Sequence, residues 1–565
     1  MKRFVTFILA LLAMQVMWAD NIGLRLLNHW DNLDGTIERG YAGRSIFFSK
    51  GKVDFNPTTI VQYAKTNQKA GINGAVLNNV NASPKMMTRE ILEGVKEIAD
   101  ILRVYNIKVY LSVNFASPKA LGELDTADPL DEGVRKWWKD KAAEIYSLIP
   151  DFGGFLVKAN SEGQPGPMDF GRTHADGANM LADALKPYGG LVMWRAFVYA
   201  ANSPDRACQA YNEFVPLDGQ FHDNVILQIK NGPIDFQPRE PVSALFFAMK
   251  KTRLMPEFQL TQEYLGESIH TVFMPTLWRE FFDTLKPFGI HFDAVAGVSN
   301  VGDCPTMCGN RFAVFNWIAF GKFMSDTDAK ENQPEQLAHE MLQTMSKDKK
   351  FVKSMTNILL ESWEACVDYM MPLGLHHIFA GGHHYGPEPW YYVKGLREDW
   401  LPRYYHKADD WGMGFDRTKN GSGYTAQYPE PLQTMYDDIN TCPENLLLFF
   451  HHASWDYKMK NGKTLWQNLC LRYDEGVKKA ESFVKTWKKM KPYVGADIYE
   501  EQLAKFERQA KDAWWWRDAC LLYFQQFSKK QLPKGCPAPR HKLEDLMNFK
   551  LMMDNYTAAD PAVLP

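Results

Sequence analysis

Short apolar runs alternate with amphipathic stretches from residue 24 to about residue 325. Several of these runs are almost continuously apolar, such as Val225-Ile226-Leu227-Gln228-Ile229, as strands buried on both faces should be. We therefore predict eight strands, at Leu24–His29, Ile72–Asn79, Lys108–Asn114, Gly153–Asn160, Gly189–Phe197, Asn224–Lys230, Arg253–Leu260 and Asp293–Asn300.

The stretches between these runs are predicted to be helices. The clearest spans residues 84–105, where Ser83 is suited to cap the helix and Pro84 to occupy its first turn. The apolar positions of this stretch share one helical face and are Ile91, Val95, Ile98 and Leu102.

Eight β/α alternations within about 300 residues are what a (β/α)8 TIM barrel requires. A doubly wound open sheet is the competing α/β architecture. We favour the barrel because polar residues collect just after many of the predicted strands, where the active sites of such barrels lie.

Beyond about residue 330 the pattern becomes helical, at residues 335–346, 351–371, 465–488 and 498–528. Between them, residues 373–463 are poor in strand patterns and rich in Gly, Pro, His and aromatics. A connection of that length is expected to pack against something functional. We predict a catalytic barrel over residues 20–329 and a mainly helical domain over residues 330–565, with loops that reach the barrel mouth.

The N-terminus has the features of a secretory signal peptide over residues 1–19. Lys2 and Arg3 are followed by the apolar run Phe4–Ala13, and Ala19 is suited to be the cleavage residue. The run is too short to span a membrane, and no later segment has 18 unbroken apolar residues. We expect an exported protein, periplasmic or secreted, without membrane insertion.

Composition narrows the function classes. The chain is 45% hydrophobic and 23% charged, which excludes a disordered or fibrous protein. Its 64 basic and 67 acidic residues nearly balance, so we expect no general attraction to nucleic acid. No phosphate loop, dinucleotide fingerprint or nucleophile elbow is present, and no cofactor is expected.

Cysteine and histidine spacing gives little support to a metal site. The eight cysteines are scattered, and we expect buried thiols, or at most one or two disulfide bridges. Cys304 and Cys308 resemble half of a zinc site, but no second pair follows at a suitable distance. The histidines gathered after residue 370 lack the helical spacing of metalloproteases, so packing or mouth-lining roles are favoured over metal binding. They are His376, His377, His383, His384, His406, His451 and His452.

The ends of the predicted strands carry the candidate chemistry. In a parallel barrel these ends meet on one face, so residues far apart in sequence should converge there. The carboxylates are Glu162, Asp235 and Glu263. The cations are Lys158, Arg195 and Lys230, and Trp30 follows the first strand. Each residue alone could instead be a strand-end cap or half of a solvated ion pair.

Three converging carboxylates suit glycoside hydrolysis. One carboxylic acid protonates the departing oxygen, and in an inverting enzyme two carboxylates can hold the attacking water opposite it. A neutral sugar does not need three cations, whereas a sugar carboxylate does. Nearby cations would keep Asp235 and Glu263 ionised, but Glu162 must stay protonated near neutral pH. Apolar burial or the charges of the other two acids would have to favour that proton.

At these residues the sequence resembles the bacterial and fungal α-glucuronidases of glycoside hydrolase family 67. The matching stretches follow one another along the chain as Leu27–Gly35, Arg39–Ser45, Gly71–Val80, Lys158–Gly166, Arg172–Asn179, Gln228–Asp235, Phe258–Gly266, Pro372–His377 and Gly412–Arg417. The resemblance implies a TIM barrel with a helical C-terminal domain that often mediates dimerisation. It also implies inverting removal of α-1,2-linked glucuronic or 4-O-methylglucuronic acid from glucuronoxylan-derived xylooligosaccharides.

The family's residue roles carry over by motif. The general acid falls on Glu162 and the water-activating pair on Asp235 and Glu263. The uronate-binding cations fall on Lys158, Arg195 and Lys230, and the sugar-contacting tryptophan on Trp30. Glu257 is the nearest rival to Glu263, but it lies inside the predicted strand rather than past its end.

One departure from the family concerns the N-terminus. Family members usually carry a β-rich domain before the barrel, whereas here the predicted signal peptide leads almost directly into the first strand. We expect the chemistry to survive and the stability or the handling of longer substrates to be affected. The alternatives are a carbohydrate-binding protein with weakened catalysis and a glycosidase for another uronic acid, such as galacturonate.

Overall fold

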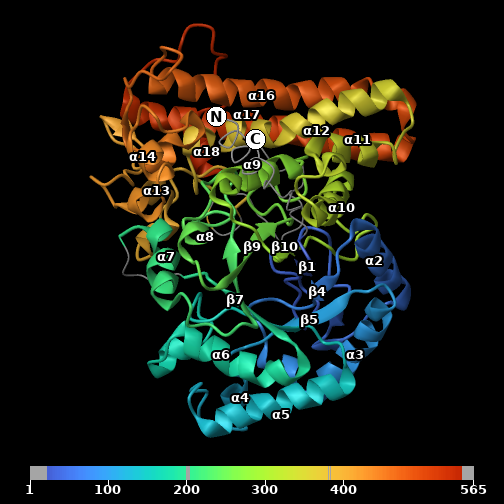
Figure 1. Cartoon of the computed structure of the whole chain (residues 1–565). Coiled ribbons are helices and arrows are strands. Elements are labelled where there is room, and N and C mark those ends of the chain that lie inside the picture. Colours follow the sequence, from blue (N-terminus) through green and yellow to red (C-terminus); the bar gives the residue numbers. More distant parts are fainter. Residues whose placement is uncertain (1–21, 199–203, 380, 382–383, 550–565) are drawn as a thin grey trace, which may run out of the picture.

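The computed structural model describes residues 22–198, 204–379, 381 and 384–549. The predicted signal peptide lies outside the described residues. The molecule has a barrel at its centre and a layer of long helices across one side of it (Figure 1). The barrel is built by the first 300 residues or so, and the helical layer by the last third of the chain.

Eight parallel strands close the barrel in the order β1-β10-β9-β8-β7-β6-β5-β4, with β4 pairing back onto β1. Every strand predicted from an apolar run is present, which confirms the TIM barrel and excludes the open sheet. The barrel strands are β1 (Leu24–Asn28), β4 (Gly74–Val76), β5 (Lys108–Ser112), β6 (Gly154–Val157), β7 (Leu191–Arg195), β8 (Val225–Lys230), β9 (Arg253–Gln259) and β10 (Ala294–Val298).

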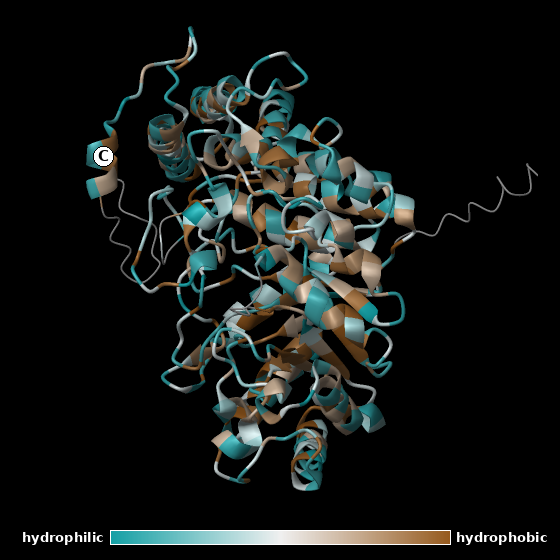
Figure 2. Cartoon of the chain, turned by 90° about the vertical axis from the view of Figure 1, so that its left-hand side faces the viewer, coloured by the Kyte–Doolittle hydropathy of each residue, from teal (hydrophilic) through white to brown (hydrophobic). Residues whose placement is uncertain are grey.

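Burial on both faces explains why these strands are almost continuously apolar. All six residues of β8 are buried, as are all five of β10. Figure 2 shows brown, hydrophobic segments at the centre of the barrel and teal, hydrophilic positions on the outer helices. Strand β6 begins at Gly154, whose φ is 137°, and a Cβ there would lie 1.9 Å from the carbonyl oxygen of Leu191. Only glycine therefore allows β6 to approach β7 this closely.

Helices surround the barrel and follow its strands. They are α2 (Pro57–Ala70), α3 (Arg89–Arg103), α4 (Ser117–Ala120), α5 (Glu132–Leu148), α6 (His174–Leu185), α7 (Gln209–Phe214), α8 (Leu245–Ala248), α9 (Pro275–Leu285) and α10 (Arg311–Ser325). Helix α10 packs against α2, which completes the outer ring. A small antiparallel pair, β2 (Phe48–Ser49) and β3 (Lys52–Val53), lies between β1 and α2 in the chain.

The helix predicted over residues 84–105 is divided in two. Ser83 does cap a turn, but that turn is the short 3-10 helix η1 (Pro84–Met87). Thr88 then takes an extended conformation, and its hydroxyl donates to the carbonyl of Lys85. This local bond competes with helix continuation, so α3 begins only at Arg89. The predicted apolar face of α3 is buried as expected.

The C-terminal part is mainly helical, as predicted. Its helices are α11 (Pro334–Leu342), α12 (Lys349–Met370), α13 (Pro402–His406), α14 (Leu432–Asp437), α15 (Leu447–Phe450), α16 (Leu465–Lys488), α17 (Ala496–Ser528) and α18 (Leu543–Asn548). Helices α12, α16 and α17 pack against one another. The strand-poor connection has one small sheet, β11 (Gly412–Met413) with β12 (Ala453–Ser454).

A buried polar cluster joins the helical part to the barrel. Asp512 of α17 lies 2.9 Å from Nε2 of His270, which belongs to the loop after β9. Tyr385 also donates to Asp512, and Nε of Arg508 lies 2.9 Å from its carboxylate. Tyr369 of α12 contacts the other ring nitrogen of His270 at 2.9 Å. One carboxylate thus connects the barrel loop to two segments of the helical part.

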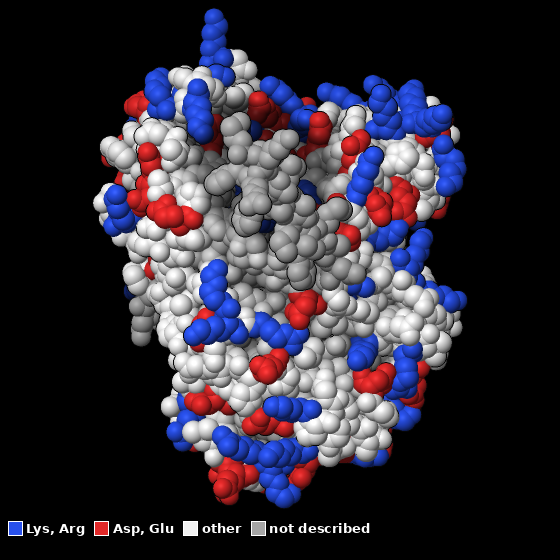
Figure 3. All heavy atoms as spheres, viewed as in Figure 1, with Lys and Arg blue, Asp and Glu red and all other residues white. Residues whose placement is uncertain are grey.

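The remaining sequence expectations concern cysteines and the surface. All eight cysteines lie among the described residues and carry free thiols. Acidic and basic side chains are interspersed over the face seen in Figure 3, in keeping with the nearly neutral net charge of −3. Among the described helices, none is both long and apolar enough to cross a membrane.

The buried cluster generates a stability prediction. We expect Asp512→Asn to lower the free energy of unfolding by about 3–5 kcal/mol, because it leaves the buried Arg508 guanidinium without its counter-charge. Urea unfolding followed by circular dichroism measures this change. The matched control is Glu500→Gln on the same helix, whose side chain is exposed and forms a surface ion pair with Lys491; it should cost less than about 1 kcal/mol. An equal effect of both substitutions would refute the prediction.

Candidate active site

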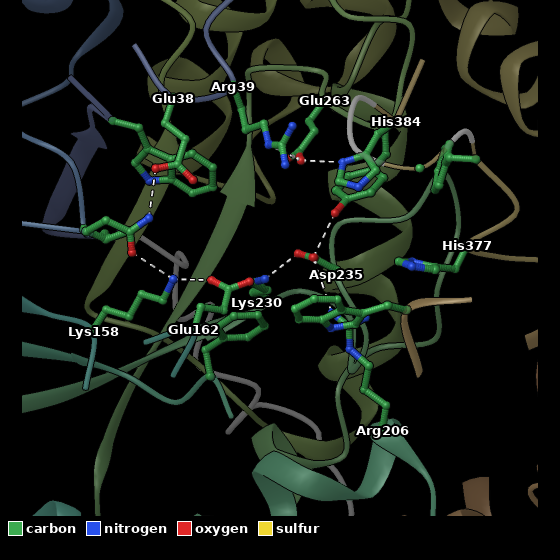
Figure 4. A pocket seen from close by; sticks show the side chains of 18 of the residues that line it. Glu38, Arg39, Lys158, Glu162, Arg206, Lys230, Asp235, Glu263, His377 and His384 are labelled. Carbon is green, nitrogen blue, oxygen red and sulfur yellow. Dashed lines mark hydrogen bonds and ion pairs between the residues drawn. The ribbon is translucent and has the colours of Figure 1, made fainter. Parts of the chain in front are cut away.

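A cavity of about 400 Å³ opens at the carboxyl ends of the barrel strands. All seven residues predicted from the strand ends line it, and Figure 4 shows the labelled ones directed toward one another. They are Trp30, Lys158, Glu162, Arg195, Lys230, Asp235 and Glu263. The barrel topology therefore brings together residues that are far apart in sequence.

Glu162 lies on the loop that leaves β6. Both Asn160 and Glu162 have positive φ, 51° and 49°, so the loop turns sharply back toward Lys158. Nζ of Lys158 donates to the Glu162 carboxylate and, at 3.0 Å, to Oδ1 of Asn81. Lys158 is buried, whereas 41% of the Glu162 side chain is exposed. The predicted acid thus stands at the open side of the cavity, paired with one of the predicted uronate-binding cations.

Asp235 is surrounded by hydrogen-bond donors. Lys230 donates to Oδ1, while Tyr264 and Arg206 donate to Oδ2 at 2.8 Å and 3.4 Å. Burial works to raise the pKa of Asp235, but the charges of Lys230 and Arg206 and these hydrogen bonds outweigh it, and the pKa lies below its usual value. For Lys230, burial dominates and lowers the pKa of its ammonium group. Asp235 is therefore held as a carboxylate.

The loop that carries Asp235 is fixed by a second carboxylate, Glu240. Oε1 of Glu240 accepts the backbone N–H groups of Asp235 and Gln237, both at 2.9 Å, and Oε2 accepts that of Ile234 at 2.6 Å. Three charge-assisted bonds to one side chain define the path of the loop. Burial raises the pKa of Glu240, and the three hydrogen bonds, which lower the pKa, offset the effect of burial only in part.

Glu263 is held by three side chains from different parts of the chain. Nε of Arg39 lies 3.0 Å and Nδ1 of His384 lies 2.7 Å from Oε1, and Gln259 donates to Oε2 at 2.7 Å. Burial works to raise the pKa of Glu263, but the charge of Arg39 and the bond to His384 prevail and lower it. Among the described residues, Gln259 is the donor to Oε2 of Glu263. A carboxylate oxygen can accept a second hydrogen bond, so Oε2 can also accept one from a water molecule.

Arg195 differs from the other two predicted cations. Its Nε and Nη2 donate to the two oxygens of Glu257 at 2.9 Å and 2.8 Å, a bidentate pair in which both side chains are buried. Glu257, the rival to Glu263 in the sequence, therefore lies inside β9 as predicted and acts as the counter-charge of Arg195. Among the described residues, Nη1 of Arg195 has no hydrogen-bond partner and remains for a ligand.

The three predicted cations lie close to one aromatic ring. Nζ of Lys230 lies 3.4 Å from the ring centroid of Phe197, Cζ of Arg195 lies 5.5 Å from it, and Nζ of Lys158 lies 5.9 Å from it. Three positive charges are thus close enough together to meet a single anionic group. Trp30 lies near them, 6.0 Å from Cζ of Arg195, and its buried Nε1 has no partner among the described residues.

The C-terminal region supplies the other side of the cavity. His377, Phe379, His384, Tyr391 and Trp400 all line it. The prediction that loops of the helical part reach the barrel mouth is therefore confirmed. Of the clustered histidines, His377 and His384 line the cavity, His376, His406 and His451 are buried, and His383 lies outside the described residues. No three His, Cys, Asp or Glu side chains in the described part of the chain form a group that could hold a metal ion.

Some functional residues were not identified from the sequence. Arg39 and Arg206 contact the two carboxylates Glu263 and Asp235, yet neither stands at a strand end. Arg39 begins one of the family-like stretches, Arg39–Ser45, which was the available indication of its importance. Tyr264 likewise lies within the family-like stretch Phe258–Gly266, whereas no sequence feature singled out Arg206.

Family models match most of the chain in two consecutive parts. The glycosyl hydrolase family 67 middle domain matches residues 10–303, and the glycosyl hydrolase family 67 C-terminus matches residues 308–537. The first match contains every barrel strand, and the second contains helices α10 to α17.

Curated relatives are similar over nearly the whole chain. Alpha-glucuronidase A of Emericella nidulans is 41% identical over 544 residues, covering 90% of this chain. Probable alpha-glucuronidase A of Aspergillus fumigatus is 41% identical over 530 residues, and alpha-glucuronidase A of Aspergillus tubingensis is 38% identical over 527 residues; each covers 89% of this chain. The chain spans 62–63% of the length of these relatives. Because the two family models match consecutive parts that together make up most of the chain, the chain belongs to glycosyl hydrolase family 67.

Proposed function

We propose that the protein is an inverting α-glucuronidase that releases α-1,2-linked glucuronic or 4-O-methylglucuronic acid from xylooligosaccharides, and so takes part in xylan degradation. The observation that carries this proposal is the gathering of three cations around Phe197 in the cavity that also holds Glu162, Asp235 and Glu263. The names of the relatives, alpha-glucuronidase A, support the same activity. Xylan is met outside the cell, which agrees with the export predicted from residues 1–19.

The cations would bind the carboxylate of the sugar. Arg195 presents Nη1 while Glu257 holds the rest of its guanidinium in place. Lys158 and Lys230 add point charges close to Phe197. Hydrogen bonds to charged groups are each worth about 1.5–3 kcal/mol, so this set discriminates strongly against a neutral hexose. The unpartnered Nε1 of Trp30 is suited to donate to a sugar oxygen.

The carboxylates would carry out the bond cleavage. Glu162 gives its proton to the glycosidic oxygen as the bond from that oxygen to the anomeric carbon breaks, and the bonding electrons leave with the oxygen. A water molecule held by Asp235 and Glu263 attacks the anomeric carbon from the opposite side, and one of these carboxylates takes its proton. Both are suited to this task because their pKa values lie below the usual range and they stay ionised.

Hydrolysis is preferred over mere carbohydrate binding because the arrangement includes the groups for both halves of the reaction. Incubation with aldouronic acids, such as glucuronosyl xylobiose, should release free uronic acid detectable by chromatography. The same incubation with galacturonosyl oligosaccharides distinguishes the alternative uronic acid. Retained binding without release of any uronic acid between pH 4 and pH 8 would refute the proposed function.

Substitution of the acid gives a sharper prediction. We expect Glu162→Gln to reduce kcat by about 10²–10⁴-fold on oligosaccharides, whose leaving groups need a proton. Aryl glucuronides with acidic phenols should be cleaved at nearly the wild-type rate because their leaving groups do not. Steady-state kinetics on the two substrate types measures the difference. Glu123→Gln is a matched control, because Glu123 is a carboxylate of the same barrel that bonds to Trp137 and does not line the cavity. Equal losses on both substrates would argue against Glu162 as the acid.

The charges around Asp235 and Glu263 predict the acid side of the pH profile. Because both pKa values are lowered, the two carboxylates should stay ionised until the pH falls below about 4, the ordinary range of free carboxyl groups. The acid limb of kcat/KM should therefore lie below that pH. The ionised forms of Asp235 and Glu263 also stabilise the fold, because their pKa values are lower in the folded protein than in the unfolded chain. This stabilisation is fully present above the pKa values of the unfolded chain and is lost as the pH falls through those of the folded protein. Circular dichroism at each pH separates unfolding from titration, and an acid limb at pH 5 or above in a folded protein would contradict the prediction.

A further inference from the structure

The charged side chains of the cavity form distinct cation–carboxylate pairs. Arg195 is paired with Glu257, Lys230 with Asp235, and Lys158 with Glu162. A uronate that enters brings one more negative charge, and it meets cations that already have partners. A uronate can bind Nη1 of Arg195 without breaking the Arg195–Glu257 pair, so the pairs with which its charge competes are those of the two lysines.

The Lys158–Glu162 pair is the one that can be exchanged most easily. Arg195 and Glu257 are 3% and 1% exposed and share two hydrogen bonds, so separating them would leave a buried charge uncompensated. Asp235 is held by Arg206 and Tyr264 as well as by Lys230, and its side chain is largely buried. Glu162, in contrast, is 41% exposed on a loop, where water replaces its contacts at little cost.

We propose that the carboxylate of the bound uronoside takes Lys158 away from Glu162, and that this exchange lets Glu162 hold the proton it donates as the general acid. The inference rests on the proposed function and assigns Lys158 a second task beyond binding. It also answers how an acid can keep its proton among cations, because the substrate itself removes the cation.

Glu162 shares the cavity with both cations and carboxylates. Besides the three predicted cations, the charged side chains that line it are Glu38, Arg39, Arg206, Asp235 and Glu263. Lys158 touches Glu162 directly, and the charges of Arg195 and Lys230 interact with it at longer range. Each of these three positive charges attracts the Glu162 carboxylate. The bound uronate neutralises the same three cations and adds a negative charge beside Glu162, and both changes favour the protonated form.

The protons balance over one turnover. Glu162 takes a proton from solvent as the uronate binds, and transfers it to the glycosidic oxygen when the bond to the anomeric carbon breaks. The attacking water loses a proton to Asp235 or Glu263, which later returns it to solvent. When the uronic acid leaves, Nζ of Lys158 returns to Glu162 and Oδ1 of Asn81. A neutral glycoside that enters the cavity does not trigger this exchange and leaves the acid ionised.

Two pH profiles of the full chain test the proposal. The profile of kcat/KM reports the free protein, and the profile of kcat reports the substrate complex. With glucuronosyl xylobiose as substrate, we expect the basic limb of kcat to lie about one pH unit or more above that of kcat/KM, the size of effect that one nearby opposite charge produces. Coincident basic limbs would overturn the proposal. Absence of turnover at every pH would instead refute the proposed function itself.

A pair of variants distinguishes Lys158 from the other cations. Lys158→Met removes the exchanged partner and should bring the two basic limbs closer together, mainly by moving that of kcat/KM to higher pH. Lys230→Met is the matched control. Lys230 also lies beside the Phe197 ring, but its carboxylate partner is Asp235 instead of Glu162. This variant should weaken binding and change the separation of the limbs much less than Lys158→Met does, because Lys230 interacts with Glu162 only at longer range. An unchanged separation in Lys158→Met, or an equal loss in both variants, would overturn the proposal. If Lys158→Met is too slow to profile, Lys158→Gln, which can still contact Asn81, takes its place in the comparison.

Discussion

The balance of buried charge is the constraint on which the rest of the site depends. Moving an ion out of water costs several kcal/mol, and an attraction to a well-placed partner repays this only with good geometry. Here Lys230, Arg195 and Lys158 each contact a carboxylate, and Arg39 does the same for Glu263. A cavity rich in cations can exist inside this barrel because acids accompany each of them. The same balance makes the cavity responsive to one added negative charge.

Two parts of the chain build this balanced cavity together. The barrel supplies the three predicted carboxylates and cations, whereas His384 comes from the C-terminal region and contacts Glu263. Its neighbour Tyr385 donates to Asp512, which also holds His270 on the loop after β9. The contact between His384 and Glu263 is therefore formed by two segments that are both tied to helix α17. The helical part is in this way a component of the site as well as a cover for one side of the barrel.

Much of this arrangement could be predicted from the sequence, for physical reasons. A strand buried on both faces must be apolar, so the barrel strands were visible as runs, and parallel closure forces their carboxyl ends together. Contacts made by long loops follow no such periodicity. Arg206 lies in the segment after β7, Glu240 in that after β8 and Tyr264 in that after β9, and only the folded chain defines the paths of these segments. For the same reason, the sequence led to Arg195 being predicted as a binding cation, but gave no sign that Glu257 holds it.

On the proposal made above, a uronate bound in the cavity is balanced by a proton on Glu162. Isothermal titration calorimetry with D-glucuronate near pH 6, in buffers of different ionisation enthalpy, counts the protons taken up on binding. The account predicts uptake of a substantial fraction of one proton per site with glucuronate and none with D-glucose. Tight binding of glucuronate without proton uptake would contradict it.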